Sequence, residues 1–178
     1  MKQVQITADG ADPVIIQTRQ ILLASGSVPS VPPIPGHDLP GVMTSDELLS
    51  WDQEPFSSLL IIGGGVIGLE IALEMQRYGL QVTVLEASPR LMPRQLDPQT
   101  SEELLDCLKG IRVCTNVSIA EICGSEGRAR SVLLADGRSF PCGMVAVSCG
   151  QKANIAIAQA AGLPCGRAVI VNERMETG

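Results

Sequence analysis

The sequence between residues 59 and 79 reads LLIIGGGVIGLEIALEMQRYG and predicts a strand, a tight turn and a helix in that order. Four consecutive apolar residues open it, which is typical of a short buried strand. Three glycines follow at once, and an apolar-periodic helix then runs to about Tyr78, with Gly79 as the residue that ends it. The pattern G-x-G-x-x-G, at residues 63–68, thus joins a strand directly to a helix.

A second strand, residues 81–86, ends on the carboxylate of Glu86, 18 residues after the last glycine of the pattern. Strand, glycine-rich turn, helix and acid-terminated strand together indicate a dinucleotide-binding unit. Gly63 permits the tight turn, Gly65 lets the backbone approach a pyrophosphate, and Gly68 allows the helix to pack closely on the strand. We therefore expect the N–H groups at the helix N-terminus to hold a diphosphate.

Glu86 is predicted to determine whether NADH or NADPH is preferred. Its carboxylate would accept hydrogen bonds from the adenosine ribose and repel a 2′-phosphate by about 1 kcal/mol in water and about 4 kcal/mol at an effective dielectric constant near 20. This repulsion predicts a preference for NADH over NADPH of roughly fivefold to a thousandfold. Arg90 and Arg94 follow closely enough in sequence to soften that preference.

Two other ligands fit the same turn. It could hold the ADP half of FAD, or S-adenosylmethionine, which also favours an acidic residue at the end of the second strand. The position of the motif argues against FAD, because an FAD fingerprint usually opens its chain and about 60 residues precede this one.

The rest of the chain predicts an α/β fold with a Rossmann-like parallel sheet. A helix is expected at residues 98–109 and strands at 111–114 and 144–147, whereas residues 118–149 carry short strands with turn signals. We therefore expect an antiparallel β-meander in place of a crossover helix. Further predicted elements are a hairpin (residues 4–6 and 14–18), strands at 21–24 and 168–171, an extended Pro-rich linker at 28–36, a helical turn at 46–49 capped by Ser45, and a helix at 154–161.

Composition excludes several classes of function. Thirteen basic and nineteen acidic residues give a net charge of −6, so nucleic acid and anionic membranes are poor partners. The longest uninterrupted apolar-plus-glycine run has eleven residues, too few to span a bilayer, and the N-terminus has no apolar secretory segment. We expect a cytoplasmic protein.

The chain has six cysteines and a single histidine. Their spacing forms neither a zinc pattern nor a C-x-x-C redox pair, so buried reduced thiols are expected. The only tyrosine, Tyr78, has Val82 rather than a lysine four positions on, which excludes the acid pair of a self-contained alcohol or sugar dehydrogenase. Neither a metal site nor a catalytic residue is predicted.

Four motifs in order resemble the pyridine nucleotide-disulfide oxidoreductase family. They are LLASGSVP (residues 22–29), IPGHDLPGV (34–42), GGGVIGLE (63–70) and SCGQKAN (148–154). Within that family the chain is most similar to the NADH-dependent branch of rubredoxin and ferredoxin reductases, NADH oxidases and the flavoprotein part of nitrite reductase. The resemblance covers nearly the whole chain.

The resemblance implies an FAD domain interrupted by an NADH domain. Residues 1–36 would be a remnant of the FAD-binding domain, 37–56 a linker, 57–150 the NADH-binding domain, and 151–178 the return into the truncated FAD-binding domain. A first G-x-G-x-x-G and the family's closing Gly-Asp motif are missing, so we expect a fragment of a larger flavoenzyme. Its exposed strand edges predict a homodimer or oligomer.

The resemblance also implies roles for further residues. Ala24-Ser25-Gly26 would lie beside the flavin, and Ser148-Cys149-Gly150 would line the nicotinamide side of the pocket. Glu70 would lie near the contact between nicotinamide and flavin; as a plain helix residue it would be a solvated carboxylate. The candidate cofactor-binding residues are Ala24, Ser25, Gly26, Gly63, Gly64, Gly65, Val66, Ile67, Gly68, Glu70, Glu86, Ala87, Arg94, Ser148, Cys149 and Gly150.

The implied activity is hydride transfer from NADH to FAD and on to an unidentified acceptor. The fragment alone would bind NADH without turnover, because it lacks a complete flavin site. The alternative is a non-enzymatic NADH-binding regulatory module, for which the loop from Ala24 to Pro29 would have no use.

Overall fold

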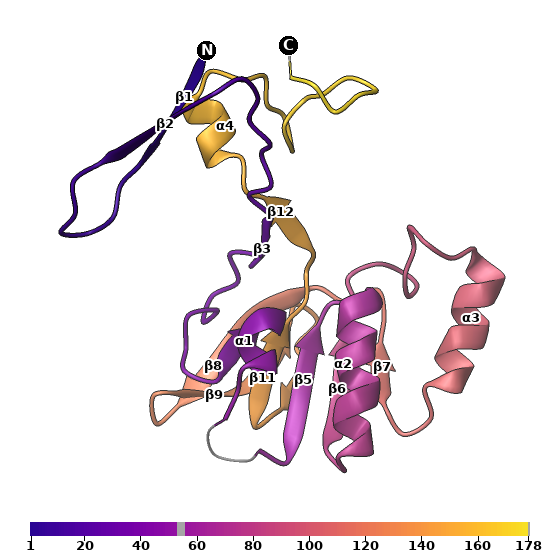
Figure 1. Ribbon diagram of the computed structural model, residues 1–178. Helices are drawn as coiled ribbons and strands as arrows, with labels where there is room; N and C mark the ends of the chain where they lie inside the picture. The colour runs from indigo at the N-terminus through magenta and orange to yellow at the C-terminus, as the bar shows by residue number, and fades with distance from the viewer. Residues whose placement is uncertain (53–55, 178) are drawn as a thin grey trace. The chain divides into compact units, whose positions relative to one another are not determined.

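The computed structural model describes residues 1–52 and 56–177. The chain forms two compact units, shown in Figure 1. One consists of Met1–Val28 with Ala153–Gly178, and the other is the continuous segment Pro29–Lys152. In the described residues, no helix has the length and apolar character needed to cross a membrane.

A five-stranded parallel sheet forms the centre of the Pro29–Lys152 unit. Its order is β4 (Val42–Thr44), β11 (Met144–Val147), β5 (Ser58–Ile62), β6 (Gln81–Leu85) and β7 (Arg112–Cys114). β5 and β11 lie inside the sheet, and their continuous apolar sequences match strands that are covered on both faces. The predicted parallel sheet is confirmed, and all its strands end at one common edge.

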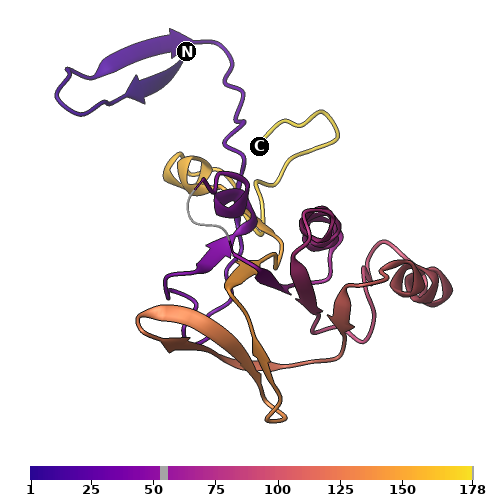
Figure 2. The same cartoon turned by 90° about the horizontal axis from the view of Figure 1, so that it is seen from below.

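Helices cover one face of this sheet. They are α1 (Ser45–Leu49), α2 (Val66–Arg77) and α3 (Pro98–Cys107), which Figure 2 shows on the same side. Leu69, Ile71 and Ala72 of α2 pack against Ile61 and Val84, which alternate along their strands with residues of the other face. α2 ends as predicted, with Gly79 at a φ of 84°.

The predicted antiparallel meander is confirmed, and it covers the opposite face of the sheet. It consists of β8 (Ile119–Ser125), β9 (Arg128–Leu134) and β10 (Ser139–Pro141), in the order β10-β9-β8. Ile122 and Val132 of the meander pack on Leu60, Ile62 and Leu85 of the sheet. The second apolar cluster of the unit therefore lies between the meander and the sheet.

The other unit contains a hairpin and a short helix. β1 (Lys2–Ile6) pairs with β2 (Val14–Thr18), as expected, and α4 spans Ala156–Ala160. The remaining two strands, β3 (Ser27–Pro29) and β12 (Gln151–Ala153), form a two-stranded sheet.

Two predicted strands are wrong. Residues 21–24 have no regular structure, and residues 168–171 contribute only an isolated bridge between Cys165 and Val169. Apolar runs become strands only when a neighbouring backbone completes their hydrogen bonds. In the described chain neither run has a neighbouring strand, and Leu22 is 90% exposed.

Helix ends differ slightly from the predictions. α1 is capped by Thr44 instead of Ser45: the N–H of Glu47 donates to the Thr44 hydroxyl, and the Glu47 carboxylate accepts from the N–H of Thr44 at 2.7 Å. This reciprocal capping box outweighs the single cap that Ser45 would provide. α3 ends at Cys107, before the predicted Lys109, and α4 is shorter than predicted at both ends.

Candidate nucleotide-binding site

The glycine-rich turn lies between the ends of three parallel strands. Gly63 follows β5, and its N–H donates to the carbonyl of Leu85 at the end of β6, at 2.8 Å. Its φ is 116°, and a Cβ there would lie 2.2 Å from the carbonyl oxygen of Ser148, which follows β11. Only glycine therefore fits this position, where the turn passes over the carboxyl edge of the sheet.

The other two motif glycines differ in the space around them. A Cβ on Gly68 would lie 2.2 Å from the carbonyl oxygen of Gly63, so the first turn of α2 is packed directly on the glycine-rich turn. A Cβ on Gly65 would have no other heavy atom within 4 Å. The backbone at Gly65 is therefore open to a ligand, whereas Gly68 is needed for packing.

Gly65 is also the N-cap of α2, and no side chain of the described residues caps this helix. Such a helix leaves its first N–H groups without intrahelical partners, and its dipole places partial positive charge there. Gly65, Val66 and Ile67 all line the pocket. This end of α2 therefore suits an anionic group of a ligand.

Glu86 ends β6 with both of its carboxylate oxygens engaged. Oε2 accepts a hydrogen bond from the N–H of Gly64 and Oε1 accepts one from the N–H of Ser88, each at 2.6 Å. The half-buried carboxylate is thus held in one orientation at the pocket wall. Each oxygen retains a lone pair that a ligand hydroxyl could use.

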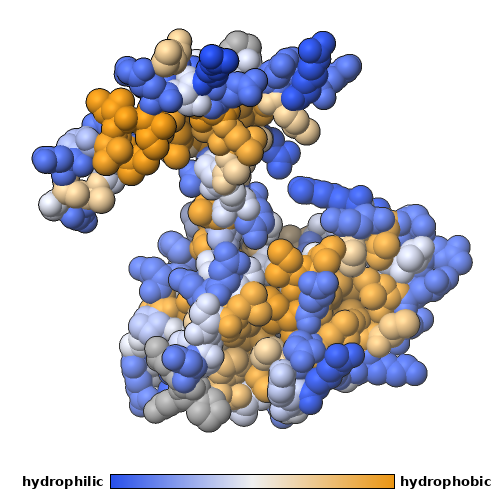
Figure 3. All heavy atoms as spheres, in the orientation of Figure 1, coloured by the Kyte–Doolittle hydropathy of each residue, from blue (hydrophilic) through white to orange (hydrophobic). Residues whose placement is uncertain are grey.

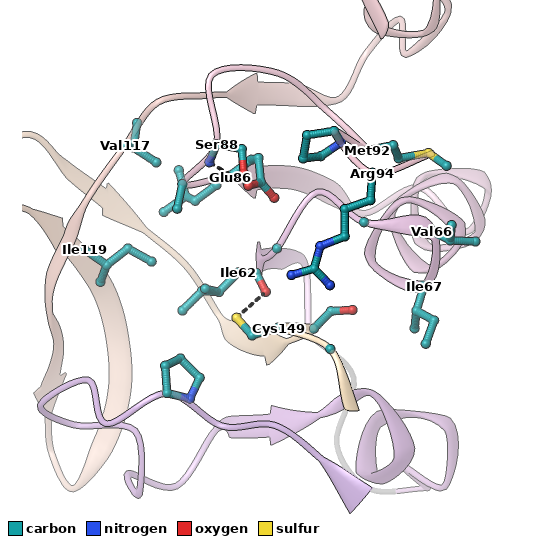
Figure 4. Close-up of a pocket in the computed structure, with 18 of the residues that line it drawn as sticks. Ile62, Val66, Ile67, Glu86, Ser88, Met92, Arg94, Val117, Ile119 and Cys149 are labelled. Carbon is teal, nitrogen blue, oxygen red and sulfur yellow. Dashed lines mark hydrogen bonds between the residues drawn. The ribbon is translucent and has the colours of Figure 1, made fainter. Parts of the chain in front are cut away.

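A pocket of about 780 Å³ opens at this edge of the sheet (Figure 4). Its size is within the range of small-molecule and cofactor sites. Its polar lining residues are Glu86, Ser88, Arg94, Gln95, Asn116, Ser118 and Ser148. Its apolar lining residues include Pro32, Ile34, Ile62, Val66, Ile67, Leu85, Met92, Val117 and Ile119.

The two nearby arginines have different environments. Arg90 donates from its guanidinium to the carbonyl oxygens of Leu96 and Pro93, the latter at 3.1 Å, and so braces its own loop. Arg94 lines the pocket, and Figure 4 shows its guanidinium reaching into it. Only Arg94 of this pair is therefore placed to meet a ligand phosphate.

Residues 148–150 border the pocket after β11. The N–H of Ser148 donates to the carbonyl of Ile62 at 2.8 Å, and the Cys149 thiol donates to the same oxygen at 3.5 Å. Cys149 is exposed as a residue, but partial desolvation of its thiol and, after it, the nearby charge of Glu86 both raise the pKa of this cysteine. Its thiol is therefore neutral at physiological pH and adds no charge to the pocket.

Ten of the sixteen sequence-predicted residues line the pocket. They are Gly63, Gly65, Val66, Ile67, Glu86, Ala87, Arg94, Ser148, Cys149 and Gly150. Gly64 and Gly68 lie behind the turn in packing contacts, and Glu70 is exposed on α2 outside the pocket lining. Residues 24–26 belong to the other compact unit, where the Ser25 hydroxyl donates to the carbonyl of Asn154 at 2.6 Å.

Sequence reasoning missed part of the lining. Asn116, Val117 and Ser118 follow β7, and their position after a parallel strand is a signal that could have found them. Pro32 and Ile34 come from the Pro-rich segment, for which the sequence carries no such signal. In the described residues, no cluster of three or more histidine, cysteine or acidic side chains could hold a metal ion.

Known proteins match most of this chain in sequence. The sequence model of the family described as Pyridine nucleotide-disulphide oxidoreductase matches residues 2–178. The chain is 35% identical over 167 residues to an NADH oxidase of Methanocaldococcus jannaschii, covering 88% of this chain and 37% of that protein. It is 37% identical over 160 residues to the ferredoxin–NAD(+) reductase component of the biphenyl dioxygenase system of Paraburkholderia xenovorans, covering 86% and 39%.

A solved structure agrees with these sequence matches. The ferredoxin reductase of Rhodopseudomonas palustris superposes with a TM-score of 0.86 at 33% identity, covering 92% of this chain and 42% of that one. The chain therefore spans about two fifths of the length of these three relatives.

Proposed function

Because the chain belongs to the pyridine nucleotide-disulphide oxidoreductase family, we propose that it carries the NADH-binding domain of an FAD-dependent oxidoreductase. The observation that carries this proposal is Glu86, whose fixed carboxylate borders a pocket that Gly63 and Gly65 also line. A carboxylate at the end of the second strand selects an unphosphorylated ribose. The whole protein would then act as an NADH-dependent enzyme.

The residues present fit a dinucleotide. The space at Gly65 admits a pyrophosphate, the N-terminus of α2 offers N–H donors, and Arg94 adds a cation. Residues 148–150 would border the nicotinamide. Residues 57–150, which supply four of the five parallel strands, are assigned to the NADH-binding domain.

Residues 1–36 and 151–178 are assigned to the flavin-binding domain, with 37–56 as the linker. Gly26, at a φ of 69°, has no heavy atom within 4 Å of the place of a Cβ, so its backbone could approach a flat ring. With both cofactors bound, C4 of the nicotinamide would supply a hydride to N5 of the flavin. The chain's own residues position the dinucleotide and exclude water; alone, it binds NADH without turnover.

Calorimetric titration of the chain with NADH, and separately with NADPH, tests this proposal. Saturable NADH binding with weaker NADPH binding is the expected result. Binding of neither nucleotide, together with saturable binding of FAD, would instead assign the turn to the ADP half of FAD. Dye reduction by NADH without added flavin would contradict the absence of turnover.

Self-association through the β1–β2 hairpin is proposed as well. Three aliphatic side chains on one face of this hairpin, Ile6, Val14 and Ile16, are between 46% and 56% exposed. Figure 3 shows apolar surface gathered in this region. An exposed two-stranded hairpin with an apolar face readily pairs with a second chain.

A further inference from the structure

Ser101 of α3 is one of two polar residues that are buried in the described part of the chain, and it is only 3% exposed. A serine within a helix usually points to solvent or donates its hydroxyl to a carbonyl of the preceding turn. Here the carbonyl of Asp97 accepts the N–H of Ser101 at 3.0 Å, whereas the hydroxyl donates to the carbonyl of Leu91 at 2.8 Å. This hydroxyl therefore ties α3 to the loop that precedes it.

The opposite side of this loop is fixed to the glycine-rich turn. The N–H of Met92 donates to the carbonyl of Gly64 at 3.2 Å. The side chain of Leu91 is buried, and a Cβ on Gly64 would lie 2.6 Å from its Cδ2 atom. Met92 has a φ of 47°, in the left-handed region that costs free energy for a residue other than glycine, so contacts on both sides must hold it there.

These two anchors precede the turn that carries Arg94. The N–H groups of Gln95 and Leu96 both donate to the carbonyl of Met92 at 3.0 Å, which closes the turn. The guanidinium of Arg94 reaches into the pocket, as Figure 4 shows. Because the turn starts at Met92, the direction of the Arg94 side chain depends on how Leu91 and Met92 are held.

We infer that Ser101 is a positioning residue for Arg94: its hydroxyl fixes the loop so that the guanidinium is already held in the pocket before a ligand phosphate arrives. This inference rests on the proposed function, in which the pocket takes a dinucleotide. Ser101 itself does not line the pocket, so it acts on binding only through the loop. A loop that is ordered in advance loses less conformational entropy when the ligand binds.

Removing the hydroxyl tests this role in the full chain. Ser101→Ala keeps a good helix former in α3 and is expected to raise the NADH Kd about threefold to fivefold. The Kd should also depend less steeply on salt than in the unmodified chain, because the charge of Arg94 contributes less to binding. Amide exchange at Gln95 and Leu96 should become faster without nucleotide, since the turn that their N–H groups close is held less firmly.

A double-mutant cycle with Arg94 separates positioning from a general loss of structure. Arg94→Ala alone should raise the NADH Kd about tenfold. Adding Ser101→Ala to that variant should leave its Kd almost unchanged, because no guanidinium remains to be positioned. A purely structural role for Ser101 would instead raise the Kd by the same factor in both backgrounds.

Thr100→Ala is the matched control on the same helix. The exposed Thr100 hydroxyl donates to Oδ2 of Asp97 at 3.0 Å instead of to the carbonyl of Leu91. This variant should lower the Tm and leave the NADH Kd and its salt dependence unchanged. If Ser101→Ala does not fold, Ser101→Cys replaces it; this variant keeps a weak donor of similar size and should raise the Kd by a smaller factor.

Three results separate the possible failures. An unchanged NADH Kd in the folded Ser101 variant would overturn the inference. A rise in Kd by the same factor with and without Arg94 would also overturn it, because Ser101 would then not act through that guanidinium. Absence of NADH binding in the unmodified chain would overturn the proposed function itself and this inference with it.

Discussion

The N–H of Gly64 donates to Oε2 of Glu86 at 2.6 Å, so the acidic end of β6 is tied to the glycine-rich turn after β5. The second oxygen of the same carboxylate is tied to Ser88. Glu86 therefore has two functions: it braces the turn, and it presents charge to the pocket. A carboxylate held by two N–H donors cannot rotate away from a 2′-phosphate without leaving both donors unpaired.

Replacing Glu86 by glutamine should change both functions. Glu86→Gln removes the charge that repels a 2′-phosphate, so the ratio of NADPH to NADH Kd values should fall at least about fivefold. It should also cost about 1–3 kcal/mol of unfolding free energy, since the amide NH₂ faces a backbone N–H. Calorimetry and urea unfolding measure the two effects.

Glu103→Gln is the control for this change. Glu103 is exposed on α3, and its carboxylate accepts a hydrogen bond from the Gln99 amide at 3.1 Å. This variant should retain the unmodified nucleotide preference and stability. An unaltered preference in Glu86→Gln would remove the basis for NADH selection by this residue.

Alanine substitutions at two glycines of the turn should have different effects, one on stability and the other on nucleotide binding. Gly68→Ala places a Cβ 2.2 Å from the carbonyl oxygen of Gly63 and should cost about 1–3 kcal/mol of unfolding free energy. Gly65→Ala meets no atom within 4 Å and should fold normally, yet its Cβ would occupy space needed by the pyrophosphate. Chemical unfolding together with NADH titration distinguishes these outcomes. Normal NADH affinity in Gly65→Ala would mean that the phosphates lie elsewhere.

The two arginines of the loop after β6 provide another matched pair. Arg94→Ala should raise the NADH Kd about tenfold, because a charge-assisted contact to phosphate is lost, with little change in stability. Arg90→Ala should lower the Tm, since its guanidinium holds the carbonyls of Pro93 and Leu96. The Arg94 effect should shrink at high salt. Equal losses of NADH affinity in both variants would contradict this division of roles.

Stability should fall in alkaline solution because of Cys142. Burial raises the pKa of this thiol from its ordinary 9.0 to about 11. Its stabilising contribution is therefore complete below about pH 9 and is lost as the pH rises toward 11, where the unfolded chain releases a proton that the folded chain retains. Urea midpoints measured across that window should decline less steeply for Cys142→Ala.

Cys107→Ala controls for the loss of any thiol. The Cys107 side chain is exposed, so its removal should leave the pH dependence of the urea midpoint as it is in the unmodified chain. A Cys142→Ala profile parallel to the unmodified one would show that another group causes the alkaline decline.

Sedimentation velocity tests self-association through the β1–β2 hairpin. Val14 is 56% exposed and lies on the same face of the hairpin as its cross-strand partner Ile6, so a lysine there should make pairing of the apolar faces unfavourable. We expect dimers or larger species in the unmodified chain and monomers in Val14→Lys. A monomer at high concentration before any substitution would contradict the proposal.

Local patterns were sufficient for four of the five strands of the parallel sheet, but not for β4, which lies in the segment expected to be a linker. Secondary structure could be predicted from the apolar run Leu59–Ile62, from the glycines after it and from the alternation of apolar and polar residues before Glu86. Each of these signals depends only on residues that are close together in the sequence. The meander was predictable for the same reason, since turn residues such as Asp136-Gly137 separate its strands. The strands at 21–24 and 168–171 were not, because an apolar run does not reveal whether a partner strand lies beside it.

By itself, the sequence determined where four of the parallel strands lie along the chain. It also determined the glycine-rich turn that joins β5 to α2 and the carboxylate of Glu86 that borders the pocket. The tertiary structure alone decided that Ile34 and Pro32 line the same pocket, that Arg94 rather than Arg90 reaches into it, and that Gly64 braces Glu86. The physical reason is the range of the interactions. Helix caps, turns and strand periodicity act between residues a few positions apart, whereas the pocket walls meet only after the meander and the helices have packed on opposite faces of the sheet.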